Sequence, residues 1–263
     1  MKVACIQLNT NEDYNRNFLQ TVKLINLALK NNSDLVITPE TTSIISDNIN
    51  KIKKNTFKMV NDPLIQRCKK LSKKFKKWIL IGSLIVRDKK NFKNRSILIG
   101  PNGNIIKYYD KINMFDVKLP NGEIHKESKI YKPGKKLVKI ELPWGKLGFS
   151  ICFDLRFPEL YRKLSKNNLS FIAIPSAFTK TTGRKHWLPL LKARAIENFC
   201  YVFAPNQTGK NTKKKNTFGH TAIISPDGNI LKLKKSGIGI IYARINTSLP
   251  KKLKNIIPTP FKV

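Results

Sequence analysis

The sequence has few cysteines, and their spacing does not suggest a metal site or a disulfide framework. The four, Cys5, Cys68, Cys152 and Cys200, are scattered without the CxxC or CxxH spacing of zinc and redox motifs. We therefore expect reduced thiols and a cytoplasmic location. Long hydrophobic runs are also lacking, because no apolar stretch approaches the length that a membrane-spanning helix needs. The opening residues, MKVACIQL, soon turn polar, which predicts a buried strand and not a secretory signal.

Acidic residues are scarce as well. Lysine and arginine number 51 against 16 aspartates and glutamates, which gives a formal net charge of +35. Such a charge would suit a nucleic-acid-binding protein or a basic scaffold, and this is our non-enzyme alternative. The excess, however, is nearly all lysine, is spread from Lys2 to Lys262, and comes without a recognised nucleic-acid motif. We interpret it as a means of solubility or of steering anionic substrates, and do not expect nucleic acid as a partner.

The length and the hydrophobic pattern favour one layered α/β domain. Apolar runs typical of strands alternate with segments of helical period. The motifs PNGN at 101–104 and PDGN at 226–229 favour tight turns between antiparallel strands, so we expect mixed sheets. We predict a single domain over 1–263 with a short C-terminal tail from about residue 246. Strands are predicted at 3–8, 34–38, 78–86, 95–100, 147–152, 169–175, 200–205, 220–226 and 237–245, and helices at 14–30, 64–75, 158–165 and 186–199.

The segment GFSICFDLRFPEL contains the sharpest candidate for a reactive residue. We predict that an apolar strand ends on Cys152 and that a helix begins at Pro158. A cysteine on such an elbow is exposed at the end of the strand, and nearby N–H groups can stabilise a thiolate. The alternative is a structural role as a small buried core residue, and this is our interpretation of the other three cysteines.

A thiol nucleophile needs a base, and histidine is rare in this chain. His125, His186 and His220 lie outside any motif that pairs histidine with cysteine, so we interpret each as structural. Glu40 is a better candidate because it follows the strand DLVIT and Pro39. The carboxyl ends of neighbouring strands line one crevice in an α/β sheet, and a dry pocket would raise the pKa of Glu40. Without its partners, Glu40 would be interpreted by default as a helix-start or turn glutamate.

Three motifs in order resemble the nitrilase, or carbon-nitrogen hydrolase, superfamily. They are TPE at 38–40, YDKINMFDV at 109–117 and CFDLRFPEL at 152–160, and the likeness runs from Val3 to about Ile245. The resemblance implies a four-layer α-β-β-α sandwich, a Glu-Lys-Cys triad and a homodimer. Residues 174–210 and 218–231 are similar to the Nit branch, with the deaminated-glutathione amidases nearest and the ω-amidases next.

The resemblance also implies a role for each residue of the triad. Cys152 would attack the amide carbonyl and form a thioester acyl-enzyme. Glu40 would act as the base, and Lys111, helped by the backbone N–H of Phe153, would stabilise the oxyanion. Glu127 matches a second glutamate that, in the family, positions the lysine. The alternative interpretation of Glu127 is a surface residue in a lysine-rich loop. No metal or organic cofactor is implied.

Substrate contacts are also expected from this resemblance. Ser176 and Phe178 follow a strand and are predicted to form a pocket wall. Phe153 stands where relatives carry tyrosine, and Asn113 where they carry histidine, so both are candidates for substrate selection. The expected activity is hydrolysis of a small linear amide, with deaminated glutathione favoured. The alternatives are an ω-amidase acting on 2-oxoglutaramate and another small-amide or N-carbamoyl hydrolase.

Overall fold

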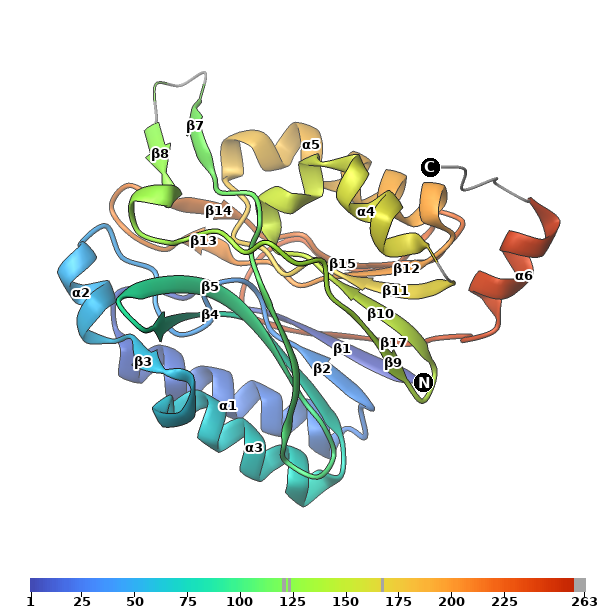
Figure 1. The fold of residues 1–263 in the computed structure, drawn as a ribbon, viewed down its shortest axis with the longest axis horizontal. Helices are drawn as coiled ribbons and strands as arrows, with labels where there is room; N and C mark the ends of the chain where they lie inside the picture. Colours follow the sequence, from blue (N-terminus) through green and yellow to red (C-terminus); the bar gives the residue numbers. More distant parts are fainter. Residues whose placement is uncertain (120–121, 123, 167, 258–263) are drawn as a thin grey trace.

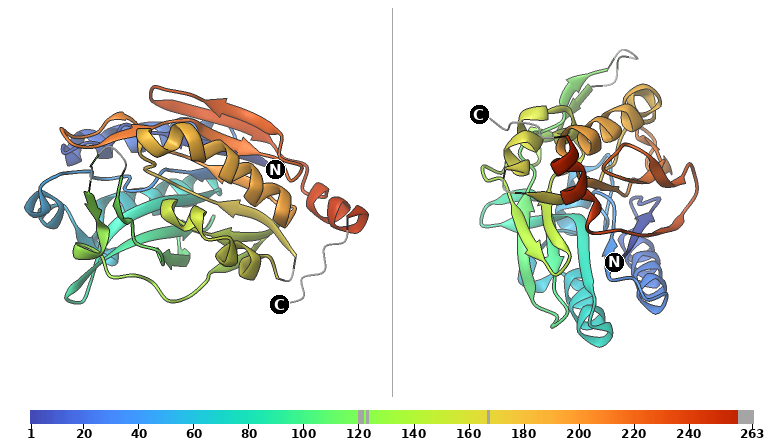
Figure 2. Two further views of the ribbon diagram at one scale, coloured as in Figure 1. Left: turned by 90° about the horizontal axis from the view of Figure 1, so that it is seen from above. Right: turned by 90° about the vertical axis from the view of Figure 1, so that its right-hand side faces the viewer.

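The computed structural model describes residues 1–119, 122, 124–166 and 168–257. Two mixed β-sheets lie face to face, and helices cover the outer face of each (Figure 1). The views in Figure 2 agree, with the blue and cyan helices on one side of the paired sheets and the yellow and orange helices on the other. The predicted four-layer sandwich with mixed sheets is confirmed.

The first sheet has seven strands in the order β17-β1-β2-β4-β5-β6, and β3 pairs with β4. Strand β1 pairs in parallel with β2 and antiparallel with β17, so this sheet joins the two ends of the described chain. Helices α1 and α3 cover it. The strands are β1 (Lys2–Gln7), β2 (Leu35–Ile37), β3 (Phe57–Lys58), β4 (Trp78–Asp88), β5 (Asn91–Ile99), β6 (Ile105–Asp110) and β17 (Gly239–Arg244), and the helices are α1 (Tyr14–Lys30), α2 (Ile49–Lys54) and α3 (Pro63–Phe75).

The second sheet has six strands in the order β16-β15-β12-β11-β10-β9. Helices α4 and α5 cover its outer face (Figure 1). Two small hairpins, β7-β8 and β13-β14, stand apart from both sheets. The elements are β9 (Lys139–Leu142), β10 (Gly145–Phe149), α4 (Pro158–Ser165), β11 (Leu169–Ala173), α5 (Lys180–Asn198), β12 (Tyr201–Ala204), β15 (Thr221–Ile224) and β16 (Ile230–Lys234), with β7 (Asp116–Lys118), β8 (Ile124–Lys126), β13 (Thr208–Lys210) and β14 (Asn216–Phe218) in the hairpins.

The alternation of side chains along the strands builds two cores. On β1, Ala4 and Ile6 face the helices and pack with Ile25 and Leu29 of α1. Their neighbour Cys5 points the other way, into a core that holds residues of both sheets and of α4 and α5. Because successive strand residues face opposite sides, one buried strand supplies both layers.

The predicted tight turns are confirmed. The motif at 101–104 joins β5 to β6 and that at 226–229 joins β15 to β16, and both strand pairs are antiparallel. Gly103 and Gly228 adopt φ values of 81° and 85°, a conformation that glycine enters without steric cost.

Two predicted boundaries, those around Cys152 and His186, are wrong. The strand before the elbow, β10, ends at Phe149, and Cys152 opens a 3-10 helix, η3 (Cys152–Arg156). Helix α5 begins at Lys180, six residues before His186, because the Thr179 side chain caps it by accepting the N–H of Thr182. The predicted tail from about residue 246 contains a helix, α6 (Leu249–Ile256).

Candidate active site

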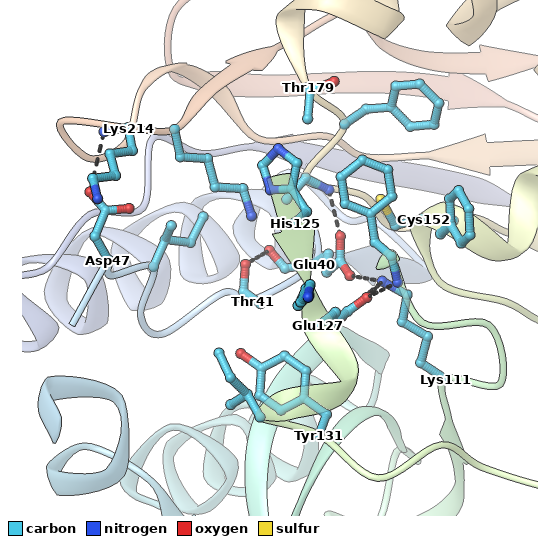
Figure 3. A pocket seen from close by; sticks show the side chains of 18 of the residues that line it. Glu40, Thr41, Asp47, Lys111, His125, Glu127, Tyr131, Cys152, Thr179 and Lys214 are labelled. Carbon is cyan, nitrogen blue, oxygen red and sulfur yellow. Dashed lines mark hydrogen bonds and ion pairs between the residues drawn. The ribbon is translucent and has the colours of Figure 1, made fainter. Parts of the chain in front are cut away.

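Four of the predicted site residues meet at one end of the sandwich although they come from distant segments (Figure 3). Glu40 follows β2, and Lys111 directly follows β6. Glu127 opens a short 3-10 helix, η2 (Glu127–Lys129), and Cys152 opens η3. The ends of strands in two facing sheets therefore bring these side chains together.

The backbone around Cys152 is held in an unusual conformation. Cys152 has a φ of 49°, in the left-handed region, and its N–H donates to the carbonyl of Pro175 at 3.0 Å. The buried carboxylate of Asp154 accepts the N–H of Ile151 at 2.9 Å and the hydroxyl of Tyr109 at 2.7 Å. The first backbone hydrogen bond of η3 runs from Asp154 to Ile151. Phe153 is one residue before Asp154, so its N–H comes too early in η3 to have a hydrogen-bond partner within the helix.

Lys111 is the centre of a buried charge cluster. Its Nζ lies 2.9 Å from Oε1 of Glu40, and 2.7 Å and 3.0 Å from the two carboxylate oxygens of Glu127. The residue is 2% exposed. The backbone N–H of Ala177 donates to Oε2 of Glu40 at 2.8 Å, and that of Phe115 donates to Oε2 of Glu127 at 2.7 Å. Both carboxylates are thus fixed by neutral donors as well as by the lysine.

Asn94, on β5, belongs to the same cluster, and the sequence reasoning did not identify it. Its Nδ2 donates to Oε1 of Glu40 at 2.9 Å and to Oε1 of Glu127 at 3.2 Å, and its backbone carbonyl accepts the N–H of Lys111. The sequence offers no clear signal for this role, because Asn94 stands between Lys93 and Arg95, just before the predicted strand at 95–100.

The electrostatics of the cluster favour a charged carboxylate beside a neutral thiol. Burial by itself raises the pKa of Glu40, but the positive charges of Lys111 and Lys215 outweigh it and the net shift is downward. The predicted rise in this pKa is therefore wrong. Burial raises the pKa of the Cys152 thiol, and the negative charge of Glu40 raises it further. Burial lowers the pKa of Lys111, but Glu127 and Glu40 overcome this and leave it well above its ordinary value.

A cavity of about 670 Å³ opens onto this cluster. Cys152, Glu40, Lys111 and Glu127 lie at its inner end, and the predicted contacts Phe153 and Phe178 are in its wall. The wall combines aromatic and aliphatic side chains with about as many polar and charged ones. Its other members include Thr41, Ile44, Phe115, His125, Tyr131, Arg156, Thr179, Lys214 and Lys215.

The structure does not bring the other two predicted contacts to this wall. Within the described part of the chain, Ser176 and Asn113 are not among the lining residues. Ser176 is fully buried and its hydroxyl donates to the carbonyl of Ile174. Asn113 instead supports the elbow, because its backbone N–H and its side-chain Nδ2 both donate to Oδ1 of Asp154 at 2.9 Å.

The described residues hold neither a metal-ligand cluster nor a membrane-spanning helix. Among residues 1–119, 122, 124–166 and 168–257, no three His, Cys, Asp or Glu side chains cluster in a way that could hold a metal ion. The helices in that same portion of the chain are all too short or too polar to span a bilayer.

Comparison with known proteins identifies the family. The family model described as carbon-nitrogen hydrolase matches residues 2–255, so the chain belongs to that family. A deaminated glutathione amidase from Synechocystis sp. is 34% identical over 262 residues, which cover 97% of this chain and 95% of the relative. One from Dictyostelium discoideum is 39% identical over 238 residues, covering 88% and 82%. The predicted superfamily and the predicted enzyme class, an amidase, are confirmed.

Solved structures show the same fold. The NitFhit protein of C. elegans superposes with a TM-score of 0.91 at 31% identity, covering 98% of this chain and 63% of that longer chain. Saccharomyces cerevisiae Nit3, a member of branch 10 of the nitrilase superfamily, superposes with a TM-score of 0.86 at 26% identity, covering 99% and 95%.

Proposed function

We propose that this chain hydrolyses the amide of deaminated glutathione through a covalent thioester on Cys152. The observation that carries the proposal is the meeting of Cys152, Glu40, Lys111 and Glu127 at the inner end of one cavity. The substrate is chosen because the curated relatives from Synechocystis and Dictyostelium bear the name deaminated glutathione amidase.

The reaction begins with attack of the Cys152 sulfur on the amide carbonyl carbon. Glu40 takes the thiol proton as the S–C bond forms, and the carbonyl electron pair moves onto oxygen. That oxyanion is stabilised by Lys111 and by the N–H of Phe153. When the tetrahedral intermediate collapses, the C–N bond breaks, and Glu40 gives its proton to the leaving amine.

Water completes the cycle. Glu40, again ionised, takes a proton from water as the water oxygen attacks the thioester carbonyl. A second oxyanion forms at the same place, and its collapse breaks the C–S bond and returns the proton to sulfur. The carboxylic acid leaves, and Cys152 is regenerated.

The charge distribution supports this order of events. The pKa of Glu40 lies below its ordinary value and that of Cys152 above its own, so a thiolate formed ahead of attack is unfavourable. Proton transfer is therefore expected to accompany attack, when the negative charge moves from sulfur to oxygen beside Lys111. Glu127 and Asn94 hold Lys111 and Glu40 in place for that step, which is a positioning role.

The experiment is to measure release of 2-oxoglutarate from deaminated glutathione and, separately, from 2-oxoglutaramate, with wild type and Cys152→Ala. Preference for deaminated glutathione, abolished by the substitution, is the expected result. Turnover of 2-oxoglutaramate alone would move the protein to the ω-amidases. Salt-sensitive retention on DNA without thiol-dependent turnover would instead favour the basic-scaffold alternative.

We also propose a cytoplasmic location and a homodimer. Cys5, Cys68, Cys152 and Cys200 are all free and buried, which suits a reducing compartment. The homodimer rests on the family resemblance, and light scattering of the purified chain tests it. A mass near 30.1 kDa would contradict the dimer, since that is the mass of one chain.

A further inference from the structure

A half-buried lysine in the cavity wall, Lys215, has no ion-pair partner among the residues that the structure describes. The carboxylate of Asp47 also lines the cavity, but it accepts the Thr212 hydroxyl at 2.8 Å and the backbone N–H of Lys214 at 3.2 Å. Neutral donors therefore occupy that carboxylate. A half-buried charge without a counter-ion is costly, so a lysine of this kind in a cavity points to an anionic ligand.

The turn that carries Lys215 is held firmly against the rest of the protein. Asn211 and Thr212 are both buried, and Nδ2 of Asn211 donates to the carbonyl of Thr10 at 2.9 Å. The N–H of Lys215 donates to the hydroxyl of Thr212 at 2.9 Å, and its carbonyl accepts the N–H of Asn211 at 2.9 Å. Because the backbone is already ordered, a ligand that binds the amino group does not have to order the turn as well.

Lys215 lies on the Glu40 side of the cavity. Burial and Lys111 have the larger effects on the pKa of Glu40, and the positive charge of Lys215 lowers that pKa further, so the two side chains are near each other. In Figure 3, Glu40 lies between Cys152 on one side and Lys214, the neighbour of Lys215, on the other. The cavity therefore continues beyond Glu40, away from the nucleophile. The segment after Glu40 also lines it, through Thr41, Ile44, Ile45, Ser46 and Asp47.

The proposed mechanism indicates which part of a substrate reaches Lys215. Glu40 gives its proton to the leaving nitrogen, so that nitrogen must come within hydrogen-bond distance of Glu40. The acyl group stays on the sulfur of Cys152. A substituent on the leaving nitrogen can then extend into the part of the cavity beyond Glu40, where Lys215 is a half-buried cation. A primary amide, which releases ammonia, has no such substituent and makes no use of this charge.

We propose that Lys215 determines specificity by binding a carboxylate on the leaving amine, so that the site selects amides of amino acids and short peptides over amides of neutral amines and over primary amides. This inference rests on the proposed amidase function and extends it to a substrate class that is defined by its leaving amine.

The test compares two amides of 2-oxoglutarate, both joined at its C5 carboxyl. One carries glycine and the other isobutylamine, which has a similar shape and no charge, and release of 2-oxoglutarate is measured near neutral pH. In Lys215→Gln we expect kcat/KM for the glycine amide to fall about 10- to 100-fold, the range for a lost hydrogen bond to a charged group. For the isobutylamine amide we expect a change of less than about threefold. An equal loss for both amides would show that Lys215 acts only through Glu40 or the fold, and would overturn the proposal.

Three further variants sharpen the test. Lys213→Gln removes one positive charge from the exposed part of the same turn, outside the wall of this cavity, and is expected to leave both rates unchanged. Lys215→Arg keeps the charge and is expected to keep most of the preference for the glycine amide. If Lys214→Gln abolished that preference and Lys215→Gln kept it, the assignment to Lys215 would be wrong.

A binding experiment makes the result independent of turnover. Calorimetry with the glycine amide, on Cys152→Ala and on Cys152→Ala with Lys215→Gln, is expected to show affinity weakened about 10- to 100-fold by the second change. Equal affinities, or no binding to Cys152→Ala, would overturn the proposal. Turnover of 2-oxoglutaramate but of neither substituted amide would also overturn it, while leaving an amidase that depends on Cys152. A preference for the glycine amide that depends on Lys215, without turnover of deaminated glutathione, would instead reject only the proposed natural substrate.

Discussion

Lys111 and Glu127 form a two-pronged ion pair, with the lysine Nζ 2.7 Å and 3.0 Å from the two carboxylate oxygens. The N–H of Phe115 fixes one of those oxygens. The pair explains how a lysine that is 2% exposed stays charged, because a buried ammonium needs compensating negative charge. It also fixes the direction in which Lys111 presents that charge to the cavity.

The first prediction concerns Glu127→Gln, which keeps the shape of the side chain and removes its charge. Lys111 then loses one of its two carboxylate partners and turns further toward Glu40. We expect kcat to fall about 100-fold, because a displacement near 1 Å at a reacting centre has that effect. KM is expected to change little. Steady-state kinetics with the thermal midpoint as a folding control checks this, and unchanged kcat would show that Glu127 has no positioning role.

The second prediction concerns Asn94, which bridges both carboxylates. Asn94→Ala removes hydrogen bonds to two charged groups, so we expect a loss of about 2 kcal/mol in the free energy of unfolding together with lower kcat. Asn94→Asp should be worse, because it places a third carboxylate within hydrogen-bond distance of Glu40 and Glu127. Urea unfolding and kinetics measure the two effects.

A control for Asn94 is available on the same strand. Asn91 lies at the exposed start of β5, and Asn91→Ala is expected to change neither stability nor rate. Equal effects at the two positions would mean that the loss comes from disturbing strand β5, and not from removing the hydrogen bonds of Asn94 to Glu40 and Glu127.

The third prediction concerns Gly82, on β4 between the two segments that carry Glu40 and Ala177. A Cβ added there would lie 1.7 Å from the carbonyl oxygen of Thr38 and 2.6 Å from Cβ of Pro175. Both contacts are impossible without a shift of the backbone, so Gly82→Ala is expected to lower the free energy of unfolding by about 3 kcal/mol or more. Because the shift moves Glu40, activity should fall further than stability explains.

Gly237→Ala is the matched control. A Cβ there meets nothing within 4 Å, and the cost comes only from its φ of 71°. We expect a loss of about 1 kcal/mol and unchanged kcat. If Gly82→Ala were as mild as this control, the close packing of the two segments would not be what positions Glu40.

Much of the fold was predictable because its causes are local. The helix from Tyr14 to Lys30 was predicted with its full extent, since apolar periodicity and an Asp13 cap both act within a few residues. The elbow at Cys152 was predicted, but not the 3-10 turn that forms it. That turn depends on Asp154, which binds Tyr109 and Asn113 from elsewhere in the chain.

The site was predictable where a motif carried it, and not where contacts between distant strands did. The motifs gave Glu40, Lys111 and Cys152, the family resemblance added Glu127, and the structure places all four together. Asn94 was missed because its two acceptors are 54 and 33 residues away in the sequence. The direction of the Glu40 pKa shift was missed for the same reason, since it depends on charges from Lys111 and Lys215.

The last prediction concerns pH. The pKa of Glu40 lies below its ordinary value, so its ionised form is lost only as the pH falls below about 4.5. The pKa values of Cys152 and Lys111 are raised above their ordinary values of 9.0 and 10.5, so neither group loses its proton near neutrality. We therefore expect kcat/KM to be flat between about pH 5.5 and 8.5.

An inflection near neutral pH would contradict Glu40 as the base and would implicate a histidine. His125 lines the cavity, whereas the pKa of His186 is lowered by burial and by Arg156. His125→Gln distinguishes the two explanations. A neutral inflection that disappears in this variant would assign the base to His125, whereas a flat profile in both proteins would leave Glu40 as the group that moves the proton.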